Sequence, residues 1–446
     1  MGIIASTLEY ARPLRARTNA KRSGAPSADW RIAVLGAGAA GLSIAHALEH
    51  AGYRHVTVLE RSDRVGGKCC TIDLEGRSYE LGAALLTPAY QHVRALAREV
   101  GARVTPKISG ICLDLETGRK TFRVPAVRDA STLDLGIALA RLCAELVHHR
   151  RVLHPGFSAV DPKLARPFTE WAGSRGLMTA ARLMEPWFTT FGYGYVDEMP
   201  AAYVLKYAAL FGPAFELLDG GYQGLWERVA RRLDVRRNVD VRAVRRDDDG
   251  VAIEWNGRTT RFDALIVACP VDAALAVLDA GTEERDLLSR VRWQDYRVVV
   301  ASVKRFCDGR YVFFPKHFAS STRGHPMFTY RRWADSDVRL FYAFGAGDTS
   351  LDETAERVAE TVRAAGGELT RVHRTVGWRY FPHVTPADMA AGFYDRLEAL
   401  QGERRTFHAG ELLSFGTVEN VVAYSNTLVQ RGFGAPRLGI APSAWA

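Results

Sequence analysis

The sequence predicts an α/β fold, and three observations support that prediction. An apolar segment, Arg31–Leu35, is followed by a glycine-rich turn, a helix of small residues and a second apolar segment, His55–Glu60. A strand, a helix and a strand within about thirty residues are typical of a parallel sheet covered by helices. A helical stretch from about Ala126 to Leu218 comes next, and a series of strand-like segments follows it.

The expected elements follow from hydrophobic periodicity along the chain. After the first strand we expect helices at about Gly41–Ala51, Leu133–Arg150, Ala201–Leu210, Glu353–Ala365 and Asn420–Gln430. Further strands are expected at Val239–Val244, Val251–Trp255, Ala264–Ala268, Arg297–Val303, Met327–Tyr330 and Val338–Ala343.

Length and composition limit the class of protein. The chain has 446 residues, of which 47% are hydrophobic and 24% charged, so it can bury a large core in two or three domains. Its six cysteines contain no C-x-x-C pair, which argues against a disulfide framework and favours reduced thiols in the cytoplasm. No run of 18 apolar residues is present, so no membrane-spanning helix is expected.

The net charge of +9 raises the question of an acidic partner. The arginines are scattered, and no basic run carries interleaved aromatic residues, so nucleic acid is not expected as a partner. Residues 1–29 are basic and precede the first strand. We expect them to form a disordered tail, or alternatively an arm in peripheral contact with a membrane.

The turn after the first strand carries the motif G-x-G-x-x-G at Gly36, Gly38 and Gly41. The first glycine permits the tight turn, the second lets backbone approach a pyrophosphate, and the third lets the helix pack on the strand. The N-terminus of that helix attracts the anion. Glu60 ends the second strand, where a carboxylate accepts hydrogen bonds from ribose hydroxyls. NAD and FAD both fit this pattern.

The stretch Glu60–Lys68 distinguishes the two cofactors. It resembles the E-R-x-x-R-x-G-G-R/K extension of flavoproteins of the amine oxidase and phytoene desaturase superfamily. The resemblance implies a Rossmann-like FAD-binding domain of the glutathione reductase type, an inserted helical domain and a mixed-sheet substrate domain. Lys68 stands where most members have arginine. The positive charge remains, but the planar guanidinium that can donate two parallel hydrogen bonds is lost.

Distal segments extend the resemblance to the whole FAD site. Tyr79–Ala83 is similar to the segment that passes the flavin ring, and the helix near Val418 would direct its N-terminus at the flavin N1/C2 carbonyl. No attachment cysteine lies near Gly410, so the FAD is expected to be non-covalent. The implied cofactor-binding residues are Gly36, Gly38, Ala40, Gly41, Glu60, Arg61, Gly67, Lys68, Gly82, Ala83, Ala84, Val241, Gly410, Glu411 and Val418.

A narrower resemblance concerns the reaction. Phe191–Tyr195, Pro200–Tyr207, Arg332–Asp335 and Tyr380–Val384 resemble strings of the bacterial FAD-dependent polyunsaturated fatty acid isomerases. The resemblance implies that a carbon–carbon double bond of an unsaturated fatty acid or related lipid is moved. A hydride would pass to flavin N5 and return at another carbon, with no net redox change.

Six aromatic residues are expected to line an apolar substrate tunnel, and no acid–base catalytic residue is identified because the chemistry belongs to the cofactor. They are Phe191, Tyr193, Tyr195, Tyr330, Trp378 and Tyr380. The chain departs from the family at Ser109 and Gly110, where the isomerases carry arginines that could meet a carboxylate. Either Lys107 is the partner for that head group, or the substrate lacks a carboxylate.

The predicted organisation is discontinuous. We expect a tail at 1–29, an FAD-binding domain at 30–120, 216–290 and 395–433, a helical insertion at 121–215, a substrate domain at 291–394 and a tail at 434–446.

Other functions remain open at this stage. A net-redox oxidase or desaturase of the same superfamily is the main alternative, and a non-catalytic lipid-binding flavoprotein is another. Lys206 is a candidate for the lysine that related amine oxidases use with a water near flavin N5. No H-E-x-x-H or Cys/His cluster occurs, so no metal site is expected.

Overall fold

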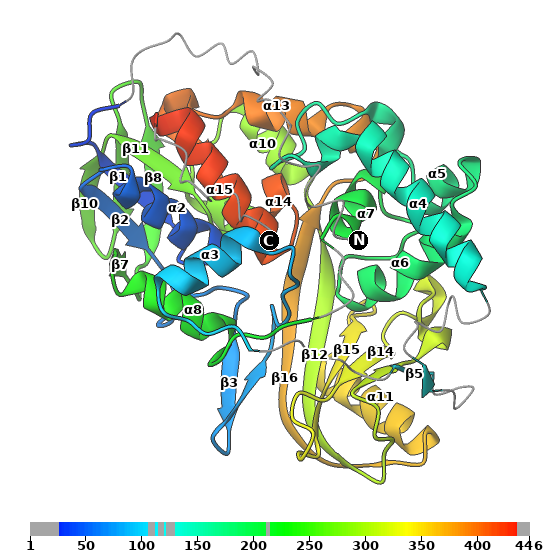
Figure 1. Ribbon diagram of the computed structural model, residues 1–446. Helices are drawn as coiled ribbons and strands as arrows, with labels where there is room; N and C mark the ends of the chain where they lie inside the picture. The colour runs from blue at the N-terminus through cyan, green and yellow to red at the C-terminus, as the bar shows by residue number, and fades with distance from the viewer. Residues whose placement is uncertain (1–25, 106–111, 115–119, 122–129, 211–214, 435–446) are drawn as a thin grey trace, which may run out of the picture.

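The computed structural model describes residues 26–105, 112–114, 120–121, 130–210 and 215–434. One part of the molecule is built on a five-stranded parallel sheet in the order β17-β11-β1-β2-β7 (Figure 1). Three separate stretches of sequence supply its strands, which are β1 (Arg31–Leu35), β2 (His55–Leu59), β7 (Asp234–Arg236), β11 (Ala264–Val267) and β17 (Thr406–His408).

Helices pack on this sheet, and the first of them, α2 (Ala39–His50), is buried from Ala40 to Leu48. Its small residues allow α15 (Val418–Phe433) to pack directly on it. The helices α3 (Gln91–Glu99) and α8 (Gly221–Ala230) lie against α15 and α2, respectively. The Glu419 carboxylate of α15 accepts hydrogen bonds from two backbone N–H groups of the first turn of α3, at 2.9 and 3.0 Å.

A small antiparallel sheet, β10-β9-β8, lies next to the parallel sheet. Its strands are β8 (Val241–Arg246), β9 (Val251–Trp255) and β10 (Arg258–Phe262), and the helices α9 (Val271–Val277) and α10 (Thr282–Ser289) follow β11. The guanidinium of Arg246 is 2% exposed and donates to both oxygens of Glu284 and to Asp279. This buried ion pair joins β8 to α10.

A seven-stranded mixed sheet, β16-β12-β15-β14-β13-β5-β6, forms the other large layer (Figure 1). Its strands are β5 (Cys112–Asp114), β6 (Lys120–Thr121), β12 (Arg292–Lys304), β13 (Tyr311–Phe313), β14 (Pro326–Tyr330), β15 (Val338–Phe344) and β16 (Glu368–His383). The helix α11 (Leu351–Ala364) packs against β12 and β16.

A helical layer lies beside this sheet (Figure 1). It contains α4 (Thr132–His148), α5 (Phe168–Ser174), α6 (Met178–Thr190), α7 (Ala201–Ala208) and the 3-10 turns η3 (Arg150–Leu153) and η4 (Pro162–Ala165). The remaining elements are the hairpin β3 (Thr71–Leu74) and β4 (Arg77–Glu80), the helices α12 (Pro386–Ala390), α13 (Phe393–Ala399) and α14 (Glu411–Ser414), and the turns η5 (Pro315–His317), η6 (Ser320–Thr322) and η7 (Glu403–Arg405).

The predicted α/β class is confirmed, and the predicted first strand–helix–strand unit agrees with the structure to within two residues. The strand β16 was not predicted, because its polar and charged positions hide the alternation of a sheet strand. The predicted N-terminal tail, apart from residues 26–29, and the segment after Gly434 lie outside the described residues. None of the described helices combines the length and apolarity that crossing a membrane requires.

We predict that Arg246→Met lowers the free energy of unfolding by about 3–5 kcal/mol, because it removes the guanidinium that donates to both oxygens of the buried Glu284 carboxylate. Urea unfolding followed by tryptophan fluorescence measures the change. Arg242→Met is the matched control on the same strand, since its side chain is 69% exposed. That control should change stability by no more than about 0.5 kcal/mol. Equal effects of the two substitutions would contradict the assignment.

Candidate active site

The turn between β1 and α2 is fixed by close backbone contacts. Gly36 has φ +100°, a conformation that side chains rarely adopt. A Cβ on Gly41 would lie 1.9 Å from the Gly36 carbonyl oxygen, so only glycine allows the helix to start this close to the strand. The first turn of α2 carries no side-chain cap at Gly38, which leaves helix N–H groups for a ligand.

Beside this turn the structure leaves open space at Gly38, which we call the diphosphate slot. Gly66 donates its N–H to the Ala37 carbonyl at 2.8 Å, which holds Gly66 and Gly67 against the turn between β1 and α2. A Cβ on Gly38 would meet only the Cα of Gly67, at 4.0 Å. The open space at Gly38 and the uncapped N-terminus of α2 fit the diphosphate of FAD. Ala40 lies in the same first turn.

Glu60 follows β2 and is held by backbone donors. One of its carboxylate oxygens accepts from the Ala37 N–H at 2.7 Å and the other from the Ser62 N–H at 2.8 Å. The Glu60 carbonyl accepts from the Val239 N–H at 2.9 Å, which brings the segment before Val241 alongside. This arrangement fits a ribose and an adjoining adenine. Arg61 is exposed at the end of the same strand.

Two predicted residues that lie 343 positions apart meet in an ion pair. Lys68 Nζ lies 2.7 Å from a carboxylate oxygen of Glu411, and the two side chains are 25% and 22% exposed. Lys68 also lies over the ring of Tyr380, 5.4 Å from its centroid. Glu411 begins α14 after Gly410, whose φ is +111°. These polar groups fit the hydroxylated chain of FAD.

A cavity opens beside these groups and holds about 850 Å³ of space free of protein atoms, part of it open to solvent. Its lining includes Gly82, Ala83 and the start of α15 at Val418. A Cβ on Gly82 would lie 1.8 Å from the Lys68 carbonyl oxygen, so this segment packs closely on the nucleotide motif. The full lining is Gly82, Ala83, Ala84, Leu85, Thr87, Tyr90, Phe191, Tyr193, Tyr207, Leu210, Phe215, Tyr296, Phe328, Tyr330, Tyr342, Tyr380, Gly416, Thr417 and Val418.

The structure brings four of the six predicted tunnel aromatics to this cavity, namely Phe191, Tyr193, Tyr330 and Tyr380. The other two lie outside its lining. The ring of Tyr195 packs against Phe344 at 5.2 Å. The indole of Trp378 donates to the Leu81 carbonyl at 2.7 Å.

Other lining residues were not identified from the sequence. They include Tyr296 on β12, Phe328 on β14 and Tyr342 on β15. Aromatic content in those strands was the only signal that could have indicated them, and it does not distinguish a cavity wall from a core.

The cavity has no charged side chain among the residues that the structure describes around it. The ionisable side chains of the described lining are tyrosines, and burial raises their pKa values. The pKa of Tyr330 rises to about 12, and those of Tyr193 and Tyr380 also rise. These phenols therefore stay neutral at physiological pH and supply no general base there.

A buried carboxylate lies behind the cavity wall at Glu80. Burial raises its pKa to about 7, although it accepts hydrogen bonds from the Thr71 hydroxyl at 2.7 Å and the Tyr222 N–H at 2.9 Å. Arg332 Nη1 lies 3.6 Å away, and both side chains are 3% exposed. This group supports the segment that leads into Gly82 and is absent from the described cavity lining.

Lys206 is placed away from the cavity. Its Nζ donates to the carbonyl oxygens of Val152, His154 and Gly156 at 2.6–3.1 Å. Burial lowers its pKa to about 7, while the three carbonyl oxygens stabilise the ammonium form. This geometry gives Lys206 a structural contact with the segment around η3. The head-group candidates Lys107, Ser109 and Gly110 lie outside the described residues.

The chain is similar to known flavoproteins in sequence and in structure. The sequence profile described as flavin containing amine oxidoreductase matches residues 39–423. The crystal structure of a CLA-producing fatty acid isomerase from P. acnes superposes with a TM-score of 0.85 at 32% identity, over 92% of this chain and 100% of that one.

Curated sequences give partial alignments. A putative flavin-containing monoamine oxidase, AofH, of Mycobacterium tuberculosis is 26% identical over 55% of this chain and 58% of its own length. A polyenoic fatty acid isomerase of Ptilota filicina is 37% identical over 73 residues, which are 16% of this chain and 15% of that protein.

We predict that Gly38→Val yields protein purified with less than about a tenth of the wild-type flavin, because the added side chain fills the diphosphate slot. Flavin absorbance per chain measures this loss. The apoprotein should keep its melting temperature, since a Cβ at this position meets no protein atom closer than 4.0 Å. Gly41→Ala, whose Cβ clashes with the Gly36 carbonyl, should lower both. A yellow Gly38→Val protein would contradict the slot.

Proposed function

The chain belongs to the family of flavin-containing amine oxidoreductases, and we propose that it is an FAD-dependent carbon–carbon double-bond isomerase of an unsaturated fatty acid or related lipid. FAD is its cofactor. We propose that the parallel and three-stranded sheets hold FAD, and that the seven-stranded sheet and the helical layer hold the substrate.

The observation that supports this proposal most strongly is the character of the cavity. An acyl chain is apolar, and the described lining consists of aromatic, aliphatic and small residues, with polar atoms only on tyrosines, threonines and backbone. A protonated amine substrate would find no carboxylate to offset its charge, since the described lining contains no Asp or Glu and offers only ring faces and neutral oxygens. The cavity therefore favours a lipid over an amine.

FAD, when bound, supplies a reversible two-electron acceptor, which allows a double bond to move within the substrate without net oxidation. Gly38 and Gly67 would leave room for its diphosphate, Glu60 would hold its ribose, and Lys68 with Glu411 would hold its polar chain. The N-terminus of α15 at Val418 places partial positive charge at the cavity wall.

The aromatic side chains position the substrate and exclude water. In the cavity lining, the ring of Phe191 packs edge to face against Phe215 and Phe328, with centroids 6.0 and 6.3 Å apart. The ring of Tyr380 packs against those of Tyr193 and Tyr296, with centroids 5.9 and 5.2 Å apart. Ring faces stabilise an electron-poor carbon by up to about 2 kcal/mol when water is absent.

The head group of a fatty acid is charged, unlike its acyl chain. The described lining offers no cationic side chain to a carboxylate, so we propose that the acyl chain is held inside the cavity and the head group at its solvent-open side.

The experiment that tests the function mixes purified yellow protein with linoleate without oxygen. We expect a growing absorbance band of a conjugated diene over many turnovers per flavin, an unchanged product mass and a flavin that stays oxidised. Flavin-free Gly38→Val protein should produce no diene. Flavin that bleaches once and stays reduced would instead identify an oxidase or desaturase. Inactivity with linoleate and with a panel of other polyunsaturated acids would overturn the lipid assignment.

We further predict that Phe191→Leu lowers kcat by about 30-fold, because it removes a ring face worth about 2 kcal/mol from a wall that stays apolar. Steady-state diene formation measures this change, and flavin content should stay unchanged. Phe407→Leu is the control, since Phe407 packs against Phe433 outside the cavity lining. Equal rates for Phe191→Leu and wild type would show that the ring does not assist the reaction.

A further inference from the structure

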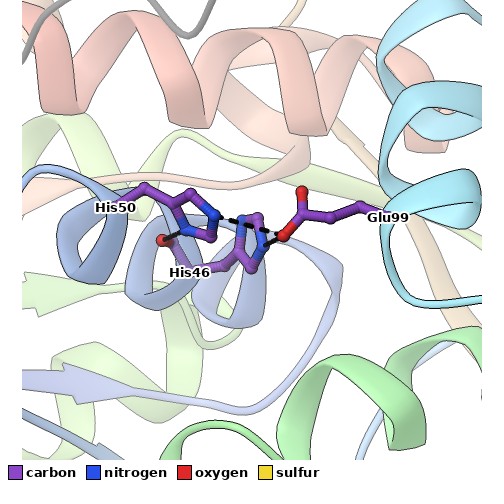
Figure 2. Close-up of side chains that lie close together, drawn as sticks. All are labelled: His46, His50 and Glu99. Carbon is purple, nitrogen blue, oxygen red and sulfur yellow. Dashed lines mark hydrogen bonds and ion pairs between the residues drawn. The ribbon is translucent and has the colours of Figure 1, made fainter.

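The C-terminal ends of two helices converge on a group of metal-ligating side chains, distant in the fold from the proposed reaction. His46 and His50 lie one turn apart on α2, and Glu99 is the last residue of α3 (Figure 2). Candidate ligand atoms of the three residues all lie within 4.8 Å of one another. Among the described residues, this is the one such group of three.

Its geometry is close to that of a metal site. One carboxylate oxygen of Glu99 lies 2.9 Å from His46 Nε2 and 3.2 Å from His50 Nε2 (Figure 2). A tetrahedral zinc ion with bonds of about 2.0–2.1 Å separates its ligand atoms by about 3.3 Å. A shift of a few tenths of an ångström therefore converts the present contacts into two edges of a coordination tetrahedron.

The tautomer of His50 supports a cation at this position. Its Nδ1 lies 2.9 Å from the backbone carbonyl oxygen of His46, which can only accept, so Nδ1 carries a proton. In the neutral ring Nε2 then presents a lone pair to the Glu99 carboxylate, and the two acceptors oppose each other. A bound cation resolves this opposition, and the Nδ1–H to carbonyl bond is the outer contact that orients metal-binding histidines.

The surroundings favour positive charge, with one exception. Both helices direct the negative ends of their dipoles at the group. His50 and Glu99 are 39% and 38% exposed, so an ion can enter, whereas His46 is 8% exposed and fixes the site in the fold. The exception is Arg232, whose Nη1 lies 3.5 Å from the same Glu99 oxygen on a side chain that is 53% exposed.

We propose that His46, His50 and Glu99 bind a divalent transition-metal ion of the zinc type, with water completing its shell. Two imidazole nitrogens and one carboxylate oxygen form the donor set that zinc takes at three-ligand sites. The bound ion would join the C-terminal end of the nucleotide-binding helix to α3. No metal was expected from the sequence because its histidines form no contiguous metal-binding motif, and the third ligand here lies 49 residues beyond the second.

The test measures zinc binding to the purified flavoprotein after treatment with a chelator. Titration calorimetry with zinc chloride should show one saturable equivalent per chain, and elemental analysis after dialysis should give the same stoichiometry. At a zinc concentration about a hundred times the dissociation constant, Tm should rise by about 1–4 °C. None of these readings depends on the catalytic activity.

Three substitutions assign the ligands. His46→Gln, His50→Gln and Glu99→Gln should each weaken zinc binding by more than about tenfold, the loss that even an outer-shell partner causes. His148→Gln, which changes an exposed histidine at the end of α4, should leave binding unchanged. Arg232→Gln should tighten binding by about two- to fivefold, because it removes a competing exposed cation.

Flavin content and circular dichroism establish that each variant is folded. If the buried His46→Gln variant fails to fold, His50→Gln and Glu99→Gln still test the site, because their side chains are partly exposed and their substitution should not disturb the core. Absence of saturable binding would identify the group as a hydrogen-bonded cluster without a metal, and would overturn the proposal. Binding that persists unchanged in all three variants would also overturn it. Either result leaves the isomerase assignment untouched, because FAD and substrate bind elsewhere.

Discussion

The close approach of Gly41 to the Gly36 carbonyl is the contact on which the arrangement of the site depends. Because no side chain separates strand from helix there, α2 lies close to the parallel sheet, and α15 can pack on its small residues. The position of α15 in turn places Val418 at the cavity wall and Glu419 at the first turn of α3. A local backbone requirement near residue 41 thus fixes groups almost 380 residues further along the chain.

The cavity lies where the nucleotide-binding part meets the seven-stranded sheet, and charge is distributed unevenly around it. Lys68 and Glu411 neutralise each other at the polar end, and Glu80 faces Arg332 behind the wall. The described lining itself holds only neutral groups at physiological pH, since burial raises the pKa of its tyrosines. The proposed apolar substrate would meet a neutral surface here, and FAD would have charged and backbone partners.

Local patterns in the sequence were sufficient for the nucleotide-binding unit, because its strand, turn and helix are contiguous and each glycine has a steric role. The aromatic wall was harder to predict. Tyr193 reaches the cavity and Tyr195 does not, because Gly194 between them has φ +107° and turns the chain. Tyr296 and Tyr342 meet, with ring centroids 5.8 Å apart, only through the pairing of β12 with β15. Such long-range register is set by tertiary packing, which no local pattern in this sequence encodes.

The two ends of α2 carry opposite partial charges, so one helix dipole would act on both the cofactor and the proposed metal. The N-terminus of a helix attracts an anion and the C-terminus a cation, so both ligands lower the electrostatic energy of one helix. Twelve residues span about 18 Å, which exceeds the screening length of about 8 Å at physiological ionic strength. Direct electrostatic coupling between the sites is therefore weak. Any influence of the metal on FAD must pass through α2 itself and through the packing of α15 on α2 and on α3.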